Sequence, residues 1–542
     1  MALRSPAILL AAFTVVGAAS RLGAGTVAAA TAEASPEALR AHVAVLASDA
    51  FAGRAPGSAG GRATEAYIVA ALRARGVEPV SASAGYLQAV PLHGSTPSPE
   101  TGLQLITPCA ARWLALRDDV LLYSSDITVL PQLVPVVFVG YGIVAPEFDY
   151  NDYAALDVTG KVVAFLEGEP PSRDPSFFSG RHATAYGAVA TKQRIAASRG
   201  AAGSLLIPSA DATAWSAWQR LFAHEDLTLP YTTPGGLNAV LSPAAARGLF
   251  CGADVTLDEV LRWQAAHTMR SFHLPAHLRA RGSFQQRDFQ AANVVGLVRG
   301  RDPGLADSYV VVSAHHDHLG VGPPVDGDAI YNGAIDNASG VAAVIEIAAA
   351  LAAAPPRRSV LFLLPTAEER GLLGSIYFLD HSPVPLGRIV ANVNVDGLAF
   401  FDRFRDVIGI GADLSTLGAT LQTVAEDLGL SVARPPDVFE HSQWFACSDQ
   451  EAFARAGVPA ILINEGFAAE HHDSDEALAW MIRWGRDVYH SPADDLSQPI
   501  DWTAAAQHAS VVLELVRAIA DDPTPPRWLP GSPYRRAPSR RR

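Results

Sequence analysis

Cysteine is scarce in this chain of 542 residues, which contains only three. Cys109, Cys251 and Cys447 lie far apart in the sequence, so the close cysteine pairs of a cysteine-ligated zinc site are missing. In an oxidising compartment the three cysteines could form one disulfide and leave one free thiol. Cys109 with Cys251 is the natural pair because both flank the same segment. Three reduced, packed thiols fit the sequence equally well.

Concentrated positive charge is also lacking, and the formal net charge is −14. Binding to phosphate needs a concentrated basic surface, so the charge argues against a general nucleic-acid binder. The basic run Arg535-Arg536 with Arg540-Arg541-Arg542 lies in a proline-rich tail, residues 523–542. We expect this tail to be solvated and disordered.

The apolar stretch near the N-terminus, Ala7–Ala19, is too short to span a bilayer. It follows Arg4 and precedes small residues, which is typical of a secretory signal peptide. Two A-x-A cleavage sites end at Ala30 and Ala32, and Gly17-Ala18-Ala19 is a weaker site. We expect residues 1–32 to be removed; an uncleaved anchor is the alternative. The sequence therefore predicts a secreted or periplasmic protein with no stable membrane insertion after cleavage.

The length and composition predict two globular units. A chain of 542 residues is too long for one small core, and 49% hydrophobic with 18% charged residues is typical of a folded protein. Within residues 116–268, short β-branched runs such as Val134–Val139 and Val162–Leu166 are separated by turn residues. We expect this segment to be a small β-rich domain inserted into a main domain formed by residues 33–115 and 285–520.

From about Ala291 onward, apolar strands alternate with longer helical stretches. The expected strands are Val294–Val298, Tyr309–Ser313, Val360–Leu364, Ile389–Val395 and Ala460–Ile463, and the expected helices include Ala338–Ala353, Leu414–Leu428 and Asp501–Ile519. This alternation predicts an α/β fold with a mostly parallel or mixed central sheet covered by helices on both faces. Ligands of such sheets bind beyond the carboxyl ends of the strands.

Histidine and acidic residues follow these strands closely. They are the cluster Ala314–His318, the cluster Gly333–Asn337, the pair Glu368-Glu369, Asp396 and His490. Carboxylate and imidazole ligands that converge from several strand ends suit two zinc-like ions sharing one water. The sequence therefore favours a metal-dependent hydrolase.

His315 and Asp317 form the first candidate pair, because strand periodicity places them on one side and His316 on the other. A metal-binding imidazole usually donates its second N–H to a carboxylate, so His315 would bind metal and Asp317 would orient it. The alternative is a histidine-rich turn on the surface.

Two further carboxylate motifs have structural alternatives. Asp336 stands at the expected helix start, where an aspartate is more often a cap than a ligand, but flanking glycines would let it approach a metal. Glu368 and Glu369 would point to opposite sides of an extended chain, so one could bind metal while the other takes a proton from the bound water. Alternatively the pair caps the helix Leu372–Leu379.

The five candidate ligands are convincing as a group rather than one by one. Asp396 and His490 are weak signals alone, but three carboxylate ligands and two histidines give each ion one imidazole, one carboxylate and a share of a bridging carboxylate. A hydroxide between ions about 3.5–4 Å apart would be nucleophilic near neutral pH. Glu368 would take its proton and pass it to the leaving amine.

At these residues the chain resembles the M28 family of zinc peptidases. The matching motifs are Ala314-His315-His316-Asp317, Gly333–Gly340, Thr366–Ser375, Asn394-Val395-Asp396, Ser448-Asp449 and Tyr489–Asp494, together with the opening Leu39–Gly57. The resemblance implies two Zn²⁺ ions held by His315, Asp336, Glu369, Asp396 and His490, with Asp336 bridging. It also implies Glu368 as general base, Asp317 behind His315, and peptides as substrates.

The inserted segment resembles a protease-associated domain, mainly in Val137–Pro170 and Lys192–Pro208. A secreted dizinc aminopeptidase is the leading hypothesis. A glutaminyl cyclase with one zinc, a carboxypeptidase or dipeptidase, and a non-catalytic relative are the alternatives. His471 or His472 could supply a substitute ligand, although a rim loop is the simpler interpretation. Side-chain preference and oligomeric state have no signature in the sequence.

Overall fold

The structure is a computed structural model that describes residues 34–81, 85–123, 133–174, 176–180, 184–208, 212–231, 236–397, 400–439 and 444–535. The predicted signal peptide and positions 536–542 of the predicted tail lie outside these residues. The prediction of disorder is wrong for residues 523–535, because Trp528 and Tyr534 are buried there. Trp528 Nε1 donates to Gly457 O at 3.1 Å, so aromatic rings among the prolines hold this segment to the core.

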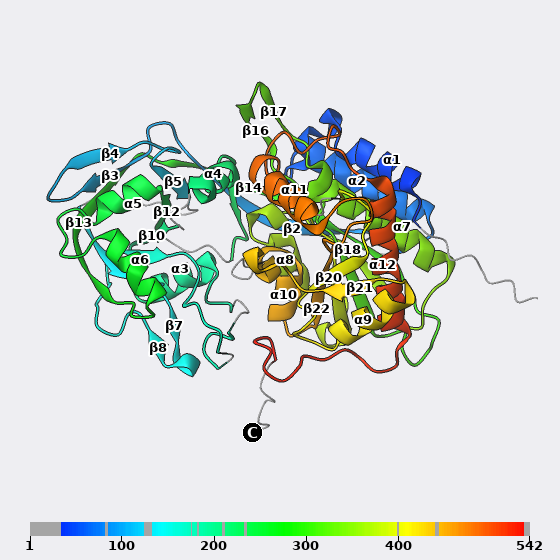
Figure 1. Cartoon of the computed structure of the whole chain (residues 1–542). Helices are drawn as coiled ribbons and strands as arrows, with labels where there is room; N and C mark the ends of the chain where they lie inside the picture. Colours follow the sequence, from blue (N-terminus) through cyan, green and yellow to red (C-terminus); the bar gives the residue numbers. More distant parts are fainter. Residues whose placement is uncertain are drawn as a thin grey trace, which may run out of the picture. The chain divides into compact units, whose positions relative to one another are not determined.

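A ten-stranded mixed sheet forms the centre of the fold (Figure 1). Its strands are β1 (Glu78–Pro79), β2 (Leu87–Pro97), β11 (Asp226–Thr228), β14 (Phe284–Val298), β15 (Tyr309–Ser313), β18 (Ser359–Leu364), β19 (Ile389–Asn394), β20 (Asp406–Ile410), β21 (Ser431–Ala433) and β22 (Ala460–Glu465). They lie in the order β11-β2-β14-β18-β15-β19-β22-β20-β21, with β1 beside β14. The central strands β18, β15, β19 and β22 are parallel, and β14 and β20 flank them antiparallel. The predicted α/β class with a mixed sheet is confirmed, and its parallel part is the middle.

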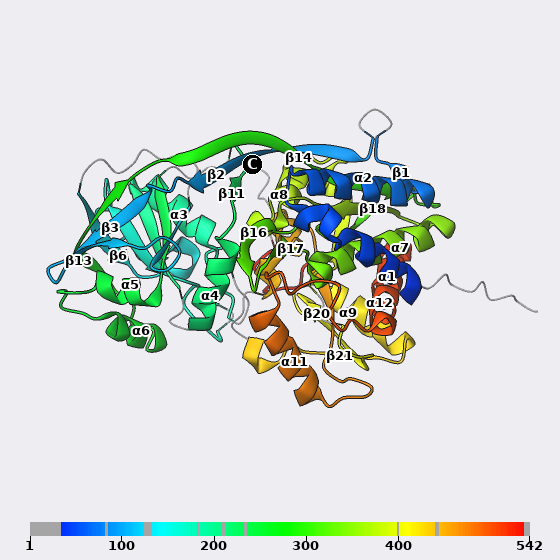
Figure 2. The same ribbon diagram turned by 90° about the horizontal axis from the view of Figure 1, so that it is seen from above.

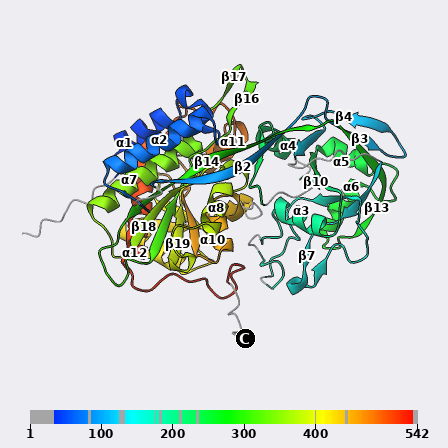
Figure 3. The same ribbon diagram turned by 180° about the vertical axis from the view of Figure 1, so that it is seen from behind.

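Helices cover both faces of this sheet (Figures 1 and 3). On one face pack α1 (Pro36–Leu46), α2 (Ala59–Ala74), α7 (Gly340–Ala353), α9 (Leu417–Asp427) and α12 (Trp502–Asp521), and on the other α8 (Leu373–Asp380) and α10 (Gln450–Arg455). Strand side chains alternate between the two cores: Val310 and Val312 join the first and Val311 the second. Each such burial stabilises the fold by roughly 1.5–3 kcal/mol.

The helix ends follow the expected chemistry. Ser35 Oγ accepts a hydrogen bond from Ala38 N at 3.0 Å and caps α1, whose first residue is Pro36. α2 is followed by Gly76 at φ +76°, a left-handed position that suits glycine. The remaining helices are α3 (Val189–Ser198), α4 (Ala212–Leu221), α5 (Pro243–Leu249), α6 (Leu257–Ala265) and α11 (Ser474–Asp487).

One helical stretch of the described residues, Ala334–Ala353, has the length and apolar character of a membrane span. It contains α7, and 89% of its apolar window is buried inside the fold. Packing in the core therefore explains its composition.

A second sheet of eight strands has its own hydrophobic core. Its strands are β3 (Gly102–Ile106), β4 (Ala111–Leu114), β5 (Val120–Tyr123), β6 (Val134–Val139), β9 (Val162–Leu166), β10 (Gly203–Ile207), β12 (Leu237–Leu241) and β13 (Ser271–Arg281). Two small hairpins, β7–β8 (Val144–Ala145, Tyr150–Asn151) and β16–β17 (Gly320–Val325, Asp328–Tyr331), complete the strands. The second sheet extends past both ends of the predicted insertion 116–268, whose limits as a domain stay a prediction.

The structure pairs Cys109 with Cys251, one of the two alternatives that the sequence left open. Their Cα atoms lie 6.0 Å apart, and Cys447 is unpaired. Strands β2 and β14 run side by side as an antiparallel pair that leads into the main sheet (Figure 2). The polar first half of β14 belongs to this pair, so the strand begins ten residues before the predicted Val294.

Candidate metal centre

The predicted ligands follow the ends of neighbouring parallel strands. β15 ends two residues before His315, β18 ends shortly before Glu368 and Glu369, and β19 ends two residues before Asp396. Parallel strands place their carboxyl ends at the same edge, so these side chains meet there. The four side chains are largely buried.

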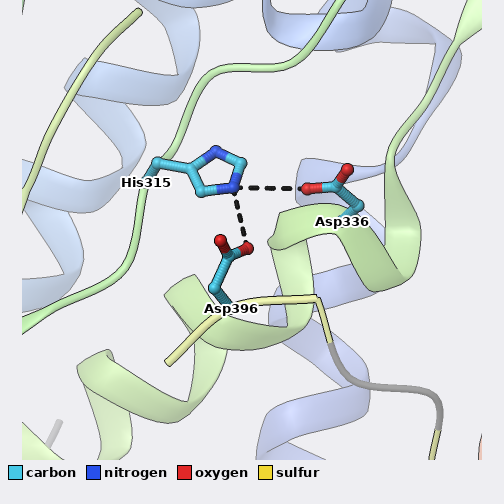
Figure 4. Close-up of side chains that lie close together, drawn as sticks. All are labelled: His315, Asp336 and Asp396. Carbon is cyan, nitrogen blue, oxygen red and sulfur yellow. Dashed lines mark hydrogen bonds and ion pairs between the residues drawn. The ribbon is translucent and has the colours of Figure 1, made fainter. Parts of the chain in front are cut away.

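The first cluster gathers around His315 (Figure 4). Its Nε2 lies 2.9 Å from Asp396 Oδ1 and 3.3 Å from Asp336 Oδ1. Glu368 Oε2 is farther away, at 3.9 Å from the same nitrogen. One imidazole nitrogen and two carboxylate oxygens that face a common point form a suitable half of a zinc site.

The second cluster gathers around His490, whose Nε2 lies 2.9 Å from Glu369 Oε2 and 3.3 Å from Asp336 Oδ2. Asp336 thus turns one oxygen to each cluster. Asp336 Oδ2 and His490 Nε2 are both buried, yet neither makes a well-formed hydrogen bond within the described part of the chain. A carboxylate oxygen and an imidazole nitrogen held this way suit a shared cation, so the residues fit the implied metal.

Buried carboxylates shift the pKa values of the two histidines in this centre away from those of free side chains. Burial alone would lower the pKa of His315, but the carboxylates of Asp396 and Glu368 outweigh it and hold this pKa well above its usual value. Burial likewise opposes protonation of His490, yet Glu369 and Asp336 raise its pKa to about 9. Both rings would have to lose a proton before binding a metal ion.

The surroundings shift the pKa values of the adjacent Glu368 and Glu369 in opposite directions. Burial and the nearby Asp396 carboxylate raise the pKa of Glu368 well above its usual range. Burial also acts on Glu369, but the neighbouring His490 and His318 overcome it and hold the pKa of Glu369 well below that range. Opposite shifts in neighbouring carboxyls are typical of one proton carrier beside one permanent anion.

The loop that carries Asp336 is held from two sides. The Asp494 carboxylate accepts hydrogen bonds from Ile335 N and Asp336 N, both at 2.9 Å. Gly333 has φ +62°, and a Cβ there would lie 2.2 Å from Asp336 O. Only glycine therefore fits this turn, which supports the expectation that glycine lets the carboxylate approach a metal. Helix α7 begins only at Gly340, so Asp336 does not cap it.

Arg54 lies beneath this loop, and the sequence interpretation gave it no role. Its buried guanidinium donates to backbone oxygens of five residues: Leu46, His316, Asn332, Gly333 and Asp336. Burial lowers its pKa, although surrounding carboxylates act in the opposite direction. Arg54 therefore ties the His316 and Asp336 loops to the first helices.

The structure corrects the predicted contact of Asp317. Its Oδ1 lies 3.9 Å from His315 Nδ1, too far for a hydrogen bond, and the Asp317 backbone oxygen contacts that nitrogen instead at 3.2 Å. The carboxylate accepts from Glu368 N at 3.1 Å. The strand ends at Ser313, so strand periodicity no longer governs these side chains.

The conformation at the glutamate pair also differs from the prediction. Residues Glu368–Arg370 form a short 3₁₀ turn after Ala367, which has φ +56°, rather than an extended segment. The two carboxylates still diverge, since Glu368 approaches the first cluster and Glu369 the second.

The alternative ligands His471 and His472 lie outside both clusters. Their Nδ1 atoms lie 2.9 and 3.0 Å from the two oxygens of Asp402. Burial would raise the pKa of Asp402, but hydrogen bonds from these histidines outweigh it and hold that pKa well below its usual range. His471 and His472 therefore hold their own loop in place by contacts with Asp402, away from the metal centre.

Two further buried groups were missed or left without a role. His318 Nδ1 lies 2.6 Å from Glu369 Oε1, and His318 joins Asp336 and Glu369 in a second candidate ligand group. Asp449, from the Ser448-Asp449 motif, is fully buried, and burial raises its pKa to about 7. The dense histidine run could have signalled His318; nothing local signals Arg54.

Contacts of the segment around His224 join the predicted insertion to loops near the metal centre. Arg370 Nη1 donates to Leu221 O at 2.7 Å. The His224 ring meets the Tyr331 ring edge to face, with centroids 4.6 Å apart. The segment after α4 therefore packs beside the turn that carries the glutamate pair.

Comparison with known proteins identifies the part of the chain that carries the centre. Residues 293–516 match the family described as Peptidase family M28. The metal centre therefore lies in a segment that matches this peptidase family. The match includes all five predicted ligands and Glu368, whereas the inserted segment lies outside it and its likeness to a protease-associated domain stays a prediction.

Several curated relatives of this chain are named as aminopeptidases, and one from Arabidopsis thaliana is named as a probable glutamate carboxypeptidase. A "probable leucine aminopeptidase 2" from Aspergillus oryzae is 29% identical over 226 residues, which cover 39% of this chain and 42% of that protein. Aminopeptidase YwaD from Bacillus subtilis is 26% identical over 226 residues, or 41% of this chain and 45% of the relative. The chain thus spans less than half the length of each.

A solved structure shows the same fold over a longer stretch. The aminopeptidase from Aneurinibacillus sp. strain AM-1 superposes with a TM-score of 0.54, covering 90% of this chain and 94% of its own. The sequences are 18% identical, so the likeness establishes the fold alone.

Proposed function

We propose that this protein is an exported dizinc aminopeptidase that hydrolyses the N-terminal peptide bond of peptides. The observation that carries the proposal is the position of Asp336 between two histidines, with one oxygen toward His315 and the other toward His490. Such sharing suits a pair of ions rather than a single one. The relatives named as aminopeptidases support the aminopeptidase reaction.

In this proposal His315, Asp336 and Asp396 hold one zinc ion, and His490, Asp336 and Glu369 hold the other. Bound zinc would supply a hydroxide nucleophile at neutral pH and polarise the scissile carbonyl. The centre is buried, so these side chains also limit the access of bulk water.

Glu368 is the proposed general base. Its carboxylate reaches toward the first cluster but is not among the nearest contacts of His315, which leaves it free to accept a proton. Its raised pKa suits a group that takes a proton from the nucleophile and gives it to the leaving amine. Asp317 fixes the backbone of Glu368 and thus acts as a positioning residue.

Glutaminyl cyclase chemistry remains a weaker alternative, since one zinc would not need all five ligands. A carboxypeptidase or dipeptidase would use the same centre, because fold and metals do not determine which end of a peptide is held. Export rests on the predicted signal peptide, and the Cys109–Cys251 disulfide supports it because disulfides persist in oxidising compartments.

The test is an assay on matched peptides with free and acetylated N-termini, and with free and amidated C-termini. We expect cleavage only where the N-terminus is free, regardless of the C-terminus, and loss of cleavage after chelation with recovery on adding zinc. Cleavage that requires a free C-terminus would select the carboxypeptidase. Cyclisation of N-terminal glutamine without hydrolysis would select the cyclase.

A further inference from the structure

His318 has no part in the proposed function, yet it lies directly against one of the proposed ligands. Its Nδ1 is 2.6 Å from Glu369 Oε1 and 3.8 Å from Asp336 Oδ2. Its side chain is 0% exposed, and its ring centroid lies 5.9 Å from that of His490. His318 therefore belongs to the wall of the second cluster.

The contact fixes which ring nitrogen carries hydrogen. An ionised carboxylate only accepts hydrogen bonds, so His318 Nδ1 must donate to Glu369 Oε1. The other nitrogen, Nε2, is buried and has no hydrogen-bond partner among the described residues. The contact that orients Glu369 is therefore the hydrogen bond from His318 Nδ1 to Glu369 Oε1.

The two oxygens of Glu369 consequently make different contacts. Oε1 is occupied by the hydrogen bond from His318, while Oε2 faces His490 Nε2 at 2.9 Å. The hydrogen bond holds the carboxylate at the rotation that turns Oε2 toward the point shared with Asp336. Carboxylate ligands held by such bonds bind metal more tightly, because less motion is lost on binding.

We infer that His318 is a positioning residue that aims Glu369 at the second metal ion. The inference rests on the proposed function, since it presumes an ion between His490, Asp336 and Glu369. Nδ1 itself cannot bind the metal, because a nitrogen that donates hydrogen has no lone pair for an ion. Binding of the ion through Nε2 is distinguished by His318→Asn, which keeps a donor in place of Nδ1 but has no counterpart of Nε2. Gly333 makes room for the ring: a Cβ there would lie 2.6 Å from His318 Cγ.

The test measures the two zinc dissociation constants of the full chain by competition with a chromophoric chelator. We expect His318→Ala to weaken one constant about 10–100-fold and to leave the other unchanged. His318→Asn should recover most of the loss, because its amide nitrogen is placed like Nδ1 and donates a hydrogen bond. In a Glu369→Ala background, His318→Ala should add no further weakening.

The matched control is His316→Ala, which also removes a buried imidazole from this loop. His316 Nε2 lies 3.0 Å from Ala292 O, and among the described residues its side chain makes no hydrogen bond or ion pair with a proposed ligand. Both constants should therefore stay as in the wild type. Equal weakening by His316→Ala and His318→Ala would contradict a specific role.

Three other results would overturn the inference. They are unchanged constants in His318→Ala, a loss in His318→Asn as large as in His318→Ala, or additive weakening in the Glu369→Ala background. Wild-type protein that binds no zinc would overturn the proposed function and this inference together. Two bound ions in the wild type with an unaffected His318→Ala would overturn the inference alone.

Discussion

Asp336 and the Glu368-Glu369 pair show how position decides the chemistry of identical groups. Asp336 addresses two histidines with its two oxygens, whereas the glutamates divide, one toward each cluster. Their surroundings shift the pKa of Glu368 upward and that of Glu369 downward. One carboxyl is thereby suited to carry a proton and the other to stay an anion beside a cation.

Glu368→Gln is the first prediction at this scale. The amide keeps the shape of the side chain but cannot accept a proton, so we expect two bound zinc ions and a kcat reduced by about 10²–10⁴-fold. Peptide hydrolysis and zinc content are measured on the same sample. Glu37→Gln, an exposed site in the first turn of α1, is the control. Wild-type turnover in Glu368→Gln would refute the base assignment.

The second prediction concerns pH. In the metal-free protein the pKa of His490 is about 9, whereas an unperturbed histidine titrates near 6.5. At pH 7 the ring is therefore protonated and must release its proton when zinc binds, so the zinc affinity should rise with pH until about 9. Calorimetry at pH 7 in buffers of different ionisation enthalpy counts the released protons. No net release would contradict the assignment of His490 as a ligand.

The residues of the metal centre could be predicted from the sequence only where a local motif contains them. His315, Asp336, Glu369, Asp396 and His490 were chosen because each motif stands where a strand or loop brings it to one edge, and the structure brings them together. Arg54 was missed because its contacts are backbone oxygens far along the chain, which leave no sequence spacing to recognise.

At the scale of elements, the apolar runs were the reliable signal. β15, β6 and β9 have the predicted bounds, since each is an uninterrupted β-branched or apolar run between turn residues. β14 was underestimated because its first half is polar and exposed, and it forms a strand by pairing with β2. Pairing between distant segments is a tertiary effect that local periodicity does not contain.

Arg54 is the clearest test at this scale, because it joins the first helices to the loops of the metal centre. Arg54→Met would leave buried carbonyl oxygens without a donor, each costing about 1–3 kcal/mol before the loops relax. We expect a loss of about 3–5 kcal/mol in the free energy of unfolding, together with weaker zinc binding.

Chemical denaturation and zinc titration measure both effects of Arg54→Met. Arg62→Met is the matched control, since exposed Arg62 donates to a single backbone oxygen, Gly57 O. A stable Arg54→Met protein with wild-type zinc affinity would show that the loops hold their shape without the guanidinium.

At the scale of the whole molecule, two sheets with separate cores share one chain. The proposed metal ligands all belong to the main sheet and its loops, while the Cys109–Cys251 disulfide joins the turn between β3 and β4 of the second sheet to the segment after α5. Stability of the second sheet and metal binding should therefore respond to different changes.

Replacing both Cys109 and Cys251 by alanine tests this separation. The disulfide closes a segment of 142 residues, for which the chain-entropy account gives about 5 kcal/mol and measured cases about 2–5 kcal/mol. We expect a melting transition at lower temperature in calorimetry and an unchanged zinc content. Cys447→Ala, which removes the unpaired thiol, is the control. Loss of zinc from the double variant would contradict independent roles.

Whether Asp336 joins two ion sites is measured by counting zinc in purified wild-type and Asp336→Ala protein, by mass spectrometry under graded chelation. We expect two zinc ions per wild-type chain and weaker retention of both ions in the variant. One ion in the wild type, or loss of only one ion in Asp336→Ala, would contradict this role of Asp336.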